Sequence, residues 1–208
     1  DSSGGGGIIY EGDVQWMTAG SGIIHEEFHS ENSSKKGGLF EMVQLWVNLP
    51  AKDKNTSPRY QHLAKTGIPV VEFPDEAGCL RLIAGEYKGL KGAADTFTEM
   101  NVWDIVLNAG KKAVLEIPET HNLSMVVLRG NVILNGKERA GAGELVGFEQ
   151  NGGNVYIEAG SEKVKILLLS GVPIDEPVVG YGPFVMNTTE EILQAISDFK
   201  SGKFGSID

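Results

Sequence analysis

The stretch Gly12–Glu27, GDVQWMTAGSGIIHEE, decides the fold of this chain. Its apolar runs are separated by the turn-like glycines Gly20 and Gly22, a pattern that predicts strand, turn and strand. The second strand carries His25 and Glu27 two residues apart. Because residues i and i+2 of a strand point to the same face of a sheet, we expect both side chains to be able to grip one metal ion.

Composition restricts the class of protein. The chain has 208 residues, of which 41% are hydrophobic and 22% charged, enough for one large or two small domains with a real core. Its 28 glycines gather in short clusters, which favours many short strands over long helices. The single cysteine, Cys79, excludes an intrachain disulfide and fits a reducing cytoplasm. We expect it to be a small buried hydrophobe within a strand at residues 79–83.

Charge and hydropathy exclude two kinds of partner. The net charge is −10 and no basic stripe offsets it, so direct binding to nucleic acid phosphates is not expected. No apolar run approaches the roughly 18 residues that span a bilayer. The sequence therefore predicts a cytoplasmic protein with no membrane and no direct nucleic acid partner.

Two β units and a tail follow one another along the chain. In the first unit, strands are expected at residues 8–10, 14–17, 23–28 and 40–47, with a polar loop at 30–38 and a linker from 50 to about 69. In the second, strands are expected at residues 101–107, 114–117, 123–128, 145–148, 155–157 and 164–169, with a hairpin turn at Asn135-Gly136. The tail begins with a capping box at Thr188 to Glu191, which predicts a helix that stops at Gly202. Short strands at this spacing indicate a sandwich, jelly roll or barrel.

The four histidines are the candidate metal ligands. His25 to His29 reads H-E-x-x-H, the zinc protease pattern, but that motif works only on a helix, and here glycines and a strand pattern surround it. On a strand, His25, Glu27 and His29 share a face and form a half-open site that suits Fe(II), and also Ni, Mn, Co or Zn. The alternative is an ordinary surface pair. His62 and His121 lack a second ligand at strand spacing, so we expect them to face solvent or to be hydrogen-bonded structurally.

Three stretches resemble the pirin family: the signature at residues 12–27, LWVNLP at 45–50 and GPFVMNT at 182–188. The resemblance implies an all-β bicupin, that is, two cupin (double-stranded β-helix, or jelly-roll) barrels with a short C-terminal helix. It divides the chain into an N-terminal cupin with its linker (1–66), a C-terminal cupin without a metal site (67–187), and a helix and tail (188–208). Pirins hold one iron through three His and one Glu, and His25 and Glu27 match the third and fourth ligands. The family's H-x-H pair would lie upstream of Asp1, so we expect these 208 residues to bind metal weakly or not at all. His29 has no counterpart in the family and could support the site from behind the ligands.

The resemblance implies one of two activities. The first is a metal-dependent dioxygenase of the quercetin 2,3-dioxygenase type, with Fe(II), a flavonol and O2, in which Glu27 accepts the proton of the substrate hydroxyl. The second is a non-enzymatic iron-binding regulator that docks a protein partner, for which the negative charge suits a basic protein.

Overall fold

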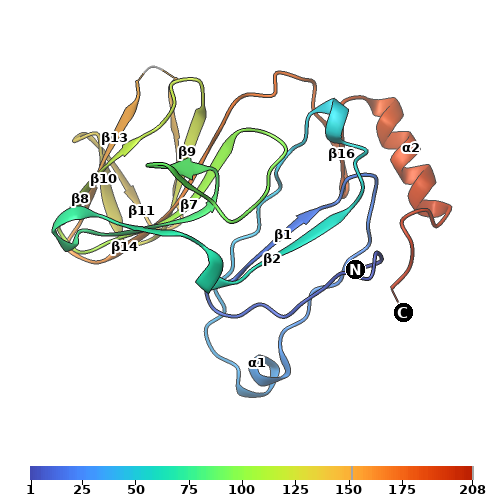
Figure 1. Cartoon of the computed structure of the whole chain (residues 1–208), viewed down its shortest axis with the longest axis horizontal. Coiled ribbons are helices and arrows are strands. Elements are labelled where there is room, and N and C mark those ends of the chain that lie inside the picture. The colour runs from blue at the N-terminus through green and yellow to red at the C-terminus, as the bar shows by residue number, and fades with distance from the viewer. Residues whose placement is uncertain (151, 208) are drawn as a thin grey trace. The chain divides into compact units, whose positions relative to one another are not determined.

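The second half of the chain is rich in strands, which run from green through yellow to orange in Figure 1. Alternating apolar side chains build these strands. The structure is a computed structural model that describes residues 1–150 and 152–207. Strand β7 (Met100–Leu107) buries Trp103, Ile105 and Leu107, as the period-two pattern predicts. Strand β14 (Val164–Gly171) runs antiparallel beside it along its whole length.

Two antiparallel sheets, built from strands between residues 70 and 171, enclose one apolar core. Among the described residues, one sheet has six strands in the order β12-β9-β14-β7-β4-β3, and the other has four in the order β11-β10-β13-β8. The remaining strands of the two sheets are β3 (Val70–Glu72), β4 (Gly78–Ala84), β8 (Lys112–Glu116), β9 (Asn122–Arg129), β10 (Asn131–Leu134), β11 (Glu138–Gly141), β12 (Leu145–Phe148) and β13 (Asn154–Ala159). Core side chains come from both sheets, so the sheets face each other as the walls of a barrel.

The predicted hairpin turn is confirmed. Asn135 and Gly136 have positive φ angles of 50° and 69°, the left-handed backbone that this pair adopts readily. They join β10 to β11, whose register pairs Leu134 with Glu138. A separate small hairpin joins β5 (Glu86–Tyr87) to β6 (Leu90–Lys91).

The first half of the chain contains fewer strands than expected. Strand β1 (Val14–Thr18) forms as predicted, and it pairs with β2 (Arg59–Leu63), which lies inside the expected linker. The predicted strands at 8–10, 23–28 and 40–47 are wrong, since these residues have no strand structure. A strand is stable only when a neighbour satisfies its backbone N–H and C=O groups, and no described strand pairs with these three segments.

Short helices occupy several connections. The expected polar loop contains α1 (Glu31–Lys36), which the sequence analysis missed; the Ser30 hydroxyl caps it by accepting from the backbone N–H of Ser33. Single turns of 3-10 helix lie at Ala51–Asp53, Lys65–Gly67 and Pro74–Glu76.

The C-terminal helix is confirmed. Helix α2 (Thr189–Lys200) starts at the capping box, in which Thr188 and Glu191 bond each other's backbone N–H groups. It buries Ile192 and Ala195, and positive-φ Gly202 follows its end. The hairpin β15 (Val179–Tyr181) and β16 (Phe184–Met186) precedes it.

The chain forms two compact units. Unit 1 contains residues 1–62 and 174–208, and unit 2 contains residues 63–173. The unit boundary after His62 falls close to the predicted domain boundary after residue 66, whereas residues 174–187 group with unit 1. Residue 151, in the predicted C-terminal cupin, and residue 208, in the predicted tail, lie outside the described residues. Neither α1 nor α2 has the length and apolar content needed to cross a bilayer.

Candidate functional site

Two glycines shape the turn before His25. Gly20 has a φ of +51°, and a Cβ there would lie 2.1 Å from the carbonyl oxygen of Thr56. The backbone N–H of Ser21 donates to that same oxygen at 2.8 Å, and the N–H of Gly22 closes the turn on Ala19 at 2.9 Å. Only glycine permits this close approach, so the sequence GSG fixes where the chain turns towards His25.

His25 and Glu27 lie on the surface of unit 1. Both are exposed, as is His29, whose ring meets the ring of Phe40 edge-on at 4.8 Å. Because residues 23–28 form no strand, the same-face argument from strand periodicity does not apply to this segment. Their placement on one metal therefore stays a prediction.

The donor types at His25 and Glu27 fit a divalent transition metal, since an imidazole and a carboxylate suit Fe(II), Ni, Mn, Co or Zn. The number of donors is smaller than a closed site needs. Among the described residues, no group of three or more His, Cys, Asp and Glu side chains is arranged to hold a metal ion. That His25 and Glu27 are two ligands of a larger set is likewise a prediction from the sequence.

The barrel of unit 2 is filled by apolar side chains. Tyr87 and Trp103 stack in a tilted pair with ring centroids 4.9 Å apart. The largest fully buried side chains include Leu80, Leu82, Trp103, Ile105, Leu115, Met125, Ile157, Ile166 and Leu168. This interior is packed hydrocarbon, which stabilises the barrel.

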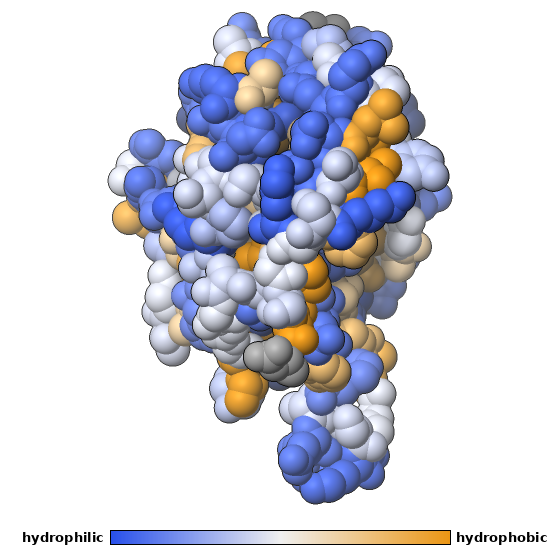
Figure 2. Space-filling view, turned by 90° about the vertical axis from the view of Figure 1, so that its right-hand side faces the viewer, coloured by the Kyte–Doolittle hydropathy of each residue, from blue (hydrophilic) through white to orange (hydrophobic). Residues whose placement is uncertain are grey.

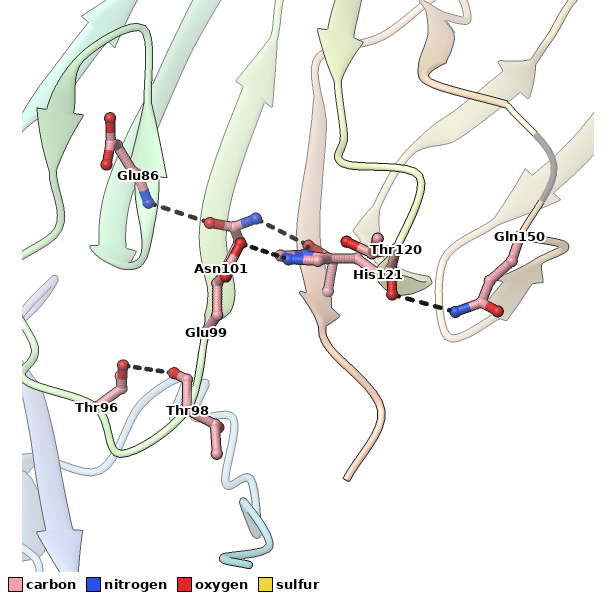
Figure 3. Close-up of polar contacts among 9 residues, drawn as sticks. Glu86, Thr96, Thr98, Glu99, Asn101, Thr120, His121 and Gln150 are labelled. Carbon is pink, nitrogen blue, oxygen red and sulfur yellow. Dashed lines mark hydrogen bonds and ion pairs between the residues drawn. The ribbon is translucent and has the colours of Figure 1, made fainter. Parts of the chain in front are cut away.

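A buried polar network crosses strands of unit 2 (Figure 3). The ring of His121, which is 4% exposed, lies between two partners: Nδ1 is 3.2 Å from the hydroxyl of Ser170, and Nε2 is 3.1 Å from a carboxylate oxygen of Glu99. The amide of Asn101 donates to the Ser170 hydroxyl at 3.0 Å. The other end of that amide accepts the backbone N–H of Glu86 at 3.1 Å.

The backbone N–H of Glu86 sets the direction of this network. It is an obligatory donor, so Oδ1 of Asn101 must face it and Nδ2 must face Ser170. With Asn101 donating to its oxygen, the Ser170 hydroxyl is free to donate to Nδ1 of His121. Neutral His121 then carries its proton on Nε2 and donates it to Glu99; this tautomer is assigned from the hydrogen bonds.

The network is a serine, a histidine and a carboxylate in a row, but it is closed. Ser170 is 7% exposed, and its oxygen and proton are both engaged by its neighbours. Each buried member has its partner, so the arrangement stabilises the barrel instead of offering a nucleophile.

The two histidines outside the signature behave as the sequence analysis expected. His121 is the structurally hydrogen-bonded case, and His62 is exposed, although it lies on β2 and not in a linker. The partners Glu99, Asn101 and Ser170 were missed. The sequence does mark two of them as unusual, because Asn101 and Ser170 are polar residues near the ends of two strongly apolar strands.

Cys79 lies half-buried on β4. Burial, together with the negative charge of Glu72, raises the pKa of its thiol above the usual value. A raised pKa leaves little thiolate at neutral pH, which agrees with the expectation of an inert side chain.

Comparisons with known proteins agree along the whole chain. The family description "Pirin C-terminal cupin domain" matches residues 102–205, and "Pirin" matches residues 1–47. A Pseudomonas aeruginosa protein that carries the provisional name quercetin 2,3-dioxygenase is 50% identical over 204 residues, which cover 98% of this chain and 71% of that protein. A pirin-like protein of Solanum lycopersicum is 38% identical, covering 99% of this chain and 69% of that protein.

One solved structure matches closely. The crystal structure of a quercetin 2,3-dioxygenase from Acinetobacter baumannii superimposes with a TM-score of 0.95 at 51% identity, over 100% of this chain and 72% of that chain. With these matches, the predicted all-β fold of two cupin barrels and a short C-terminal helix is confirmed.

Proposed function

The chain belongs to the pirin family, and from this premise we propose that it is a metal-dependent dioxygenase that cleaves flavonols such as quercetin with O2. The observation that carries the proposal is the match to the Acinetobacter baumannii enzyme, which extends over all of this chain at 51% identity. The name of the Pseudomonas aeruginosa relative supports the same reaction class.

In this proposal, His25 and Glu27 are two of the ligands of Fe(II), with Ni, Mn, Co or Zn as alternative occupants. Both side chains are exposed and follow a turn that the glycines hold in place. When bound, the metal would polarise the oxygens of a chelating flavonol. Glu27 accepts the proton of the flavonol hydroxyl, because its carboxylate is an accessible base next to His25. His29 supports the ligands without replacing one of them.

The test is oxygen uptake with quercetin by protein reconstituted with Fe(II). We would measure it in the 208-residue chain and in a version extended upstream of Asp1 by the segment that carries the family's H-x-H pair. We expect turnover in the extended form and little in the shorter one, and a loss of about 100-fold or more in His25→Ala.

His62→Ala is the matched control, because His62 is an exposed histidine of the same unit on β2, outside the signature. It should keep its turnover and its metal content. Equal rates in the two variants would refute the assignment of His25.

The second candidate is a non-enzymatic iron-binding regulator that docks a basic protein partner. The observation that favours it is the apolar surface of unit 1, where Leu39, Phe40, Met42, Val43, Leu45, Trp46 and Val47 are all exposed. One bound iron per chain without any quercetin-dependent oxygen uptake would favour this function over the dioxygenase. A cytoplasmic location and the absence of membrane and direct nucleic acid partners remain predictions from the charge and the single cysteine.

A further inference from the structure

Segments from both ends of the described chain meet at the signature. Ser2 is bonded to Ile24, the residue before His25, through two hydrogen bonds: its N–H donates to the Ile24 carbonyl at 2.8 Å, and its hydroxyl accepts the Ile24 N–H at 3.0 Å. The same hydroxyl donates its proton to the carbonyl of Phe204. Both backbone groups of Ile24 are therefore held by one residue, which is itself held by the C-terminal tail.

The ring of Phe204 presses against the signature directly. A Cβ on Gly22, whose φ is +120°, would lie 2.2 Å from Cε1 of that ring. The glycine at this position thus makes room for an aromatic side chain 182 residues away in sequence, counted from 22 to 204. Gly205 continues the contact, since a Cβ there would lie 3.0 Å from Cβ of Ser2.

The tail that provides these contacts is itself anchored. The Phe204 ring lies 6.1 Å from the ring of Phe199 on α2 and 6.2 Å from that of Phe184 on β16, measured between centroids. The ammonium of Lys203 bonds the carboxylate of Asp198 at 2.6 Å, which lowers the pKa of that carboxyl. Contacts with α2 therefore hold Phe204 in place. Phe204 in turn contacts Gly22 directly and holds Ile24 through Ser2.

We propose that the C-terminal tail is a positioning element for the candidate metal site, with Phe204 as its central positioning residue. It acts by holding the backbone of residues 22–24, which fixes the position of the backbone from which the His25 and Glu27 side chains extend. This inference rests on the proposed function for the role of His25 and Glu27, while the contacts themselves lie entirely within unit 1. A ligand held at a fixed origin loses less conformational entropy when it binds a metal.

The experiment compares the chain extended upstream of Asp1, the form in which we expect metal to bind, with its Phe204→Ala and Ser2→Ala variants. Hydrogen exchange of the amides in residues 20–27 measures how firmly the backbone is held. Titration with Ni²⁺ or Fe²⁺ measures the metal affinity of the site. We expect exchange of the Ile24 amide to accelerate about tenfold or more in both variants. Metal affinity should fall about tenfold in both, while exchange in β7 and β9 stays unchanged.

Leu193→Ala is the matched control, because Leu193 is an apolar residue of α2 that is 62% exposed. It should leave both measurements as they are in the parent chain. Unchanged exchange around Ile24 in Phe204→Ala and Ser2→Ala would overturn the proposal, and so would faster exchange with an unchanged metal affinity.

The two hypotheses fail in different ways. If the parent chain and its upstream-extended form bind no metal, the proposed function fails, and the exchange of Ile24 alone then decides whether the tail holds the signature. If the extended form binds metal and the variants bind it equally well, the metal-binding part of the proposed function stands and the positioning role is refuted.

Discussion

Ser170→Ala tests whether the buried polar network of unit 2 stabilises the folded state, as its closed set of hydrogen bonds indicates. The hydroxyl of Ser170 accepts from Asn101 and donates to His121, and all three residues are at least nine-tenths buried. The substitution removes one oxygen and leaves an amide N–H and a ring nitrogen without partners. No other part of the network needs to move for this to happen.

The expected cost follows from those two orphaned groups. Each buried polar group that loses its partner costs about 1–3 kcal/mol, so Ser170→Ala should lower the free energy of unfolding by about 2–6 kcal/mol. Asn101 cannot turn away to recover a partner, because the backbone N–H of Glu86 holds its other end. The cost should therefore appear in full.

Chemical denaturation followed by far-ultraviolet circular dichroism measures this loss, with a constant denaturant slope showing that the unfolded state is the same. Ser201→Ala is the matched control, since its exposed hydroxyl only donates to the carbonyl of Asp198, and it should cost less than about 0.5 kcal/mol. A loss below about 1 kcal/mol for Ser170→Ala would refute the reading of the network as a closed, fully used set of hydrogen bonds.

Three further predictions concern the six-stranded sheet. Arg81→Met should lower the free energy of unfolding by about 3–5 kcal/mol, because the largely buried carboxylate of Asp104 loses the guanidinium that bonds it at 2.9 Å. Replacing both residues by apolar ones should restore most of that loss in chemical denaturation. An equal loss in the single and double variants would contradict this. Gly78→Ala should cost about 3 kcal/mol or more, since its φ is +137° and the new Cβ would lie 2.0 Å from the carbonyl oxygen of Val106; a stable variant with an unchanged midpoint would refute it. Cys79 should react with a thiol reagent at neutral pH about tenfold or more slowly than in urea, because burial raises its pKa and only the thiolate reacts; equal rates would show that the thiol is accessible.

The strands, turn and helix of the second half of the chain were predictable because each is specified by residues that are close together in sequence. The alternation around Trp103 and the Asn135-Gly136 turn each specify their own backbone, and the sheets then follow from pairing neighbours. The capping box at Thr188 is equally self-contained. Such signals need no knowledge of distant residues.

The first half was not predictable in the same way. Residues 23–28 and 40–47 have the apolar content of strands, but a strand also requires a partner, and sequence patterns do not reveal whether one is present. The contact between Gly22 and Phe204 was invisible for a related reason. A glycine that makes room for a distant ring looks the same in sequence as a glycine in a turn.

The polar network illustrates a third limit. Asn101 and Ser170 each interrupt an apolar strand, which marks them as unusual, yet nothing in the linear sequence indicates that they meet at His121. A buried polar residue signals only that some partner exists. Identifying that partner requires the register of β14 against its neighbours.

The hydrogen bond from the Ser2 hydroxyl to the Phe204 carbonyl joins two segments of unit 1 that lie far apart in sequence. The bond spans 202 positions of the sequence, so it is a highly non-local contact of unit 1. Closing so long a loop costs chain entropy that only structure already formed can offset, so we expect this contact, and with it the fixed backbone of the signature, to form late in folding, after α2.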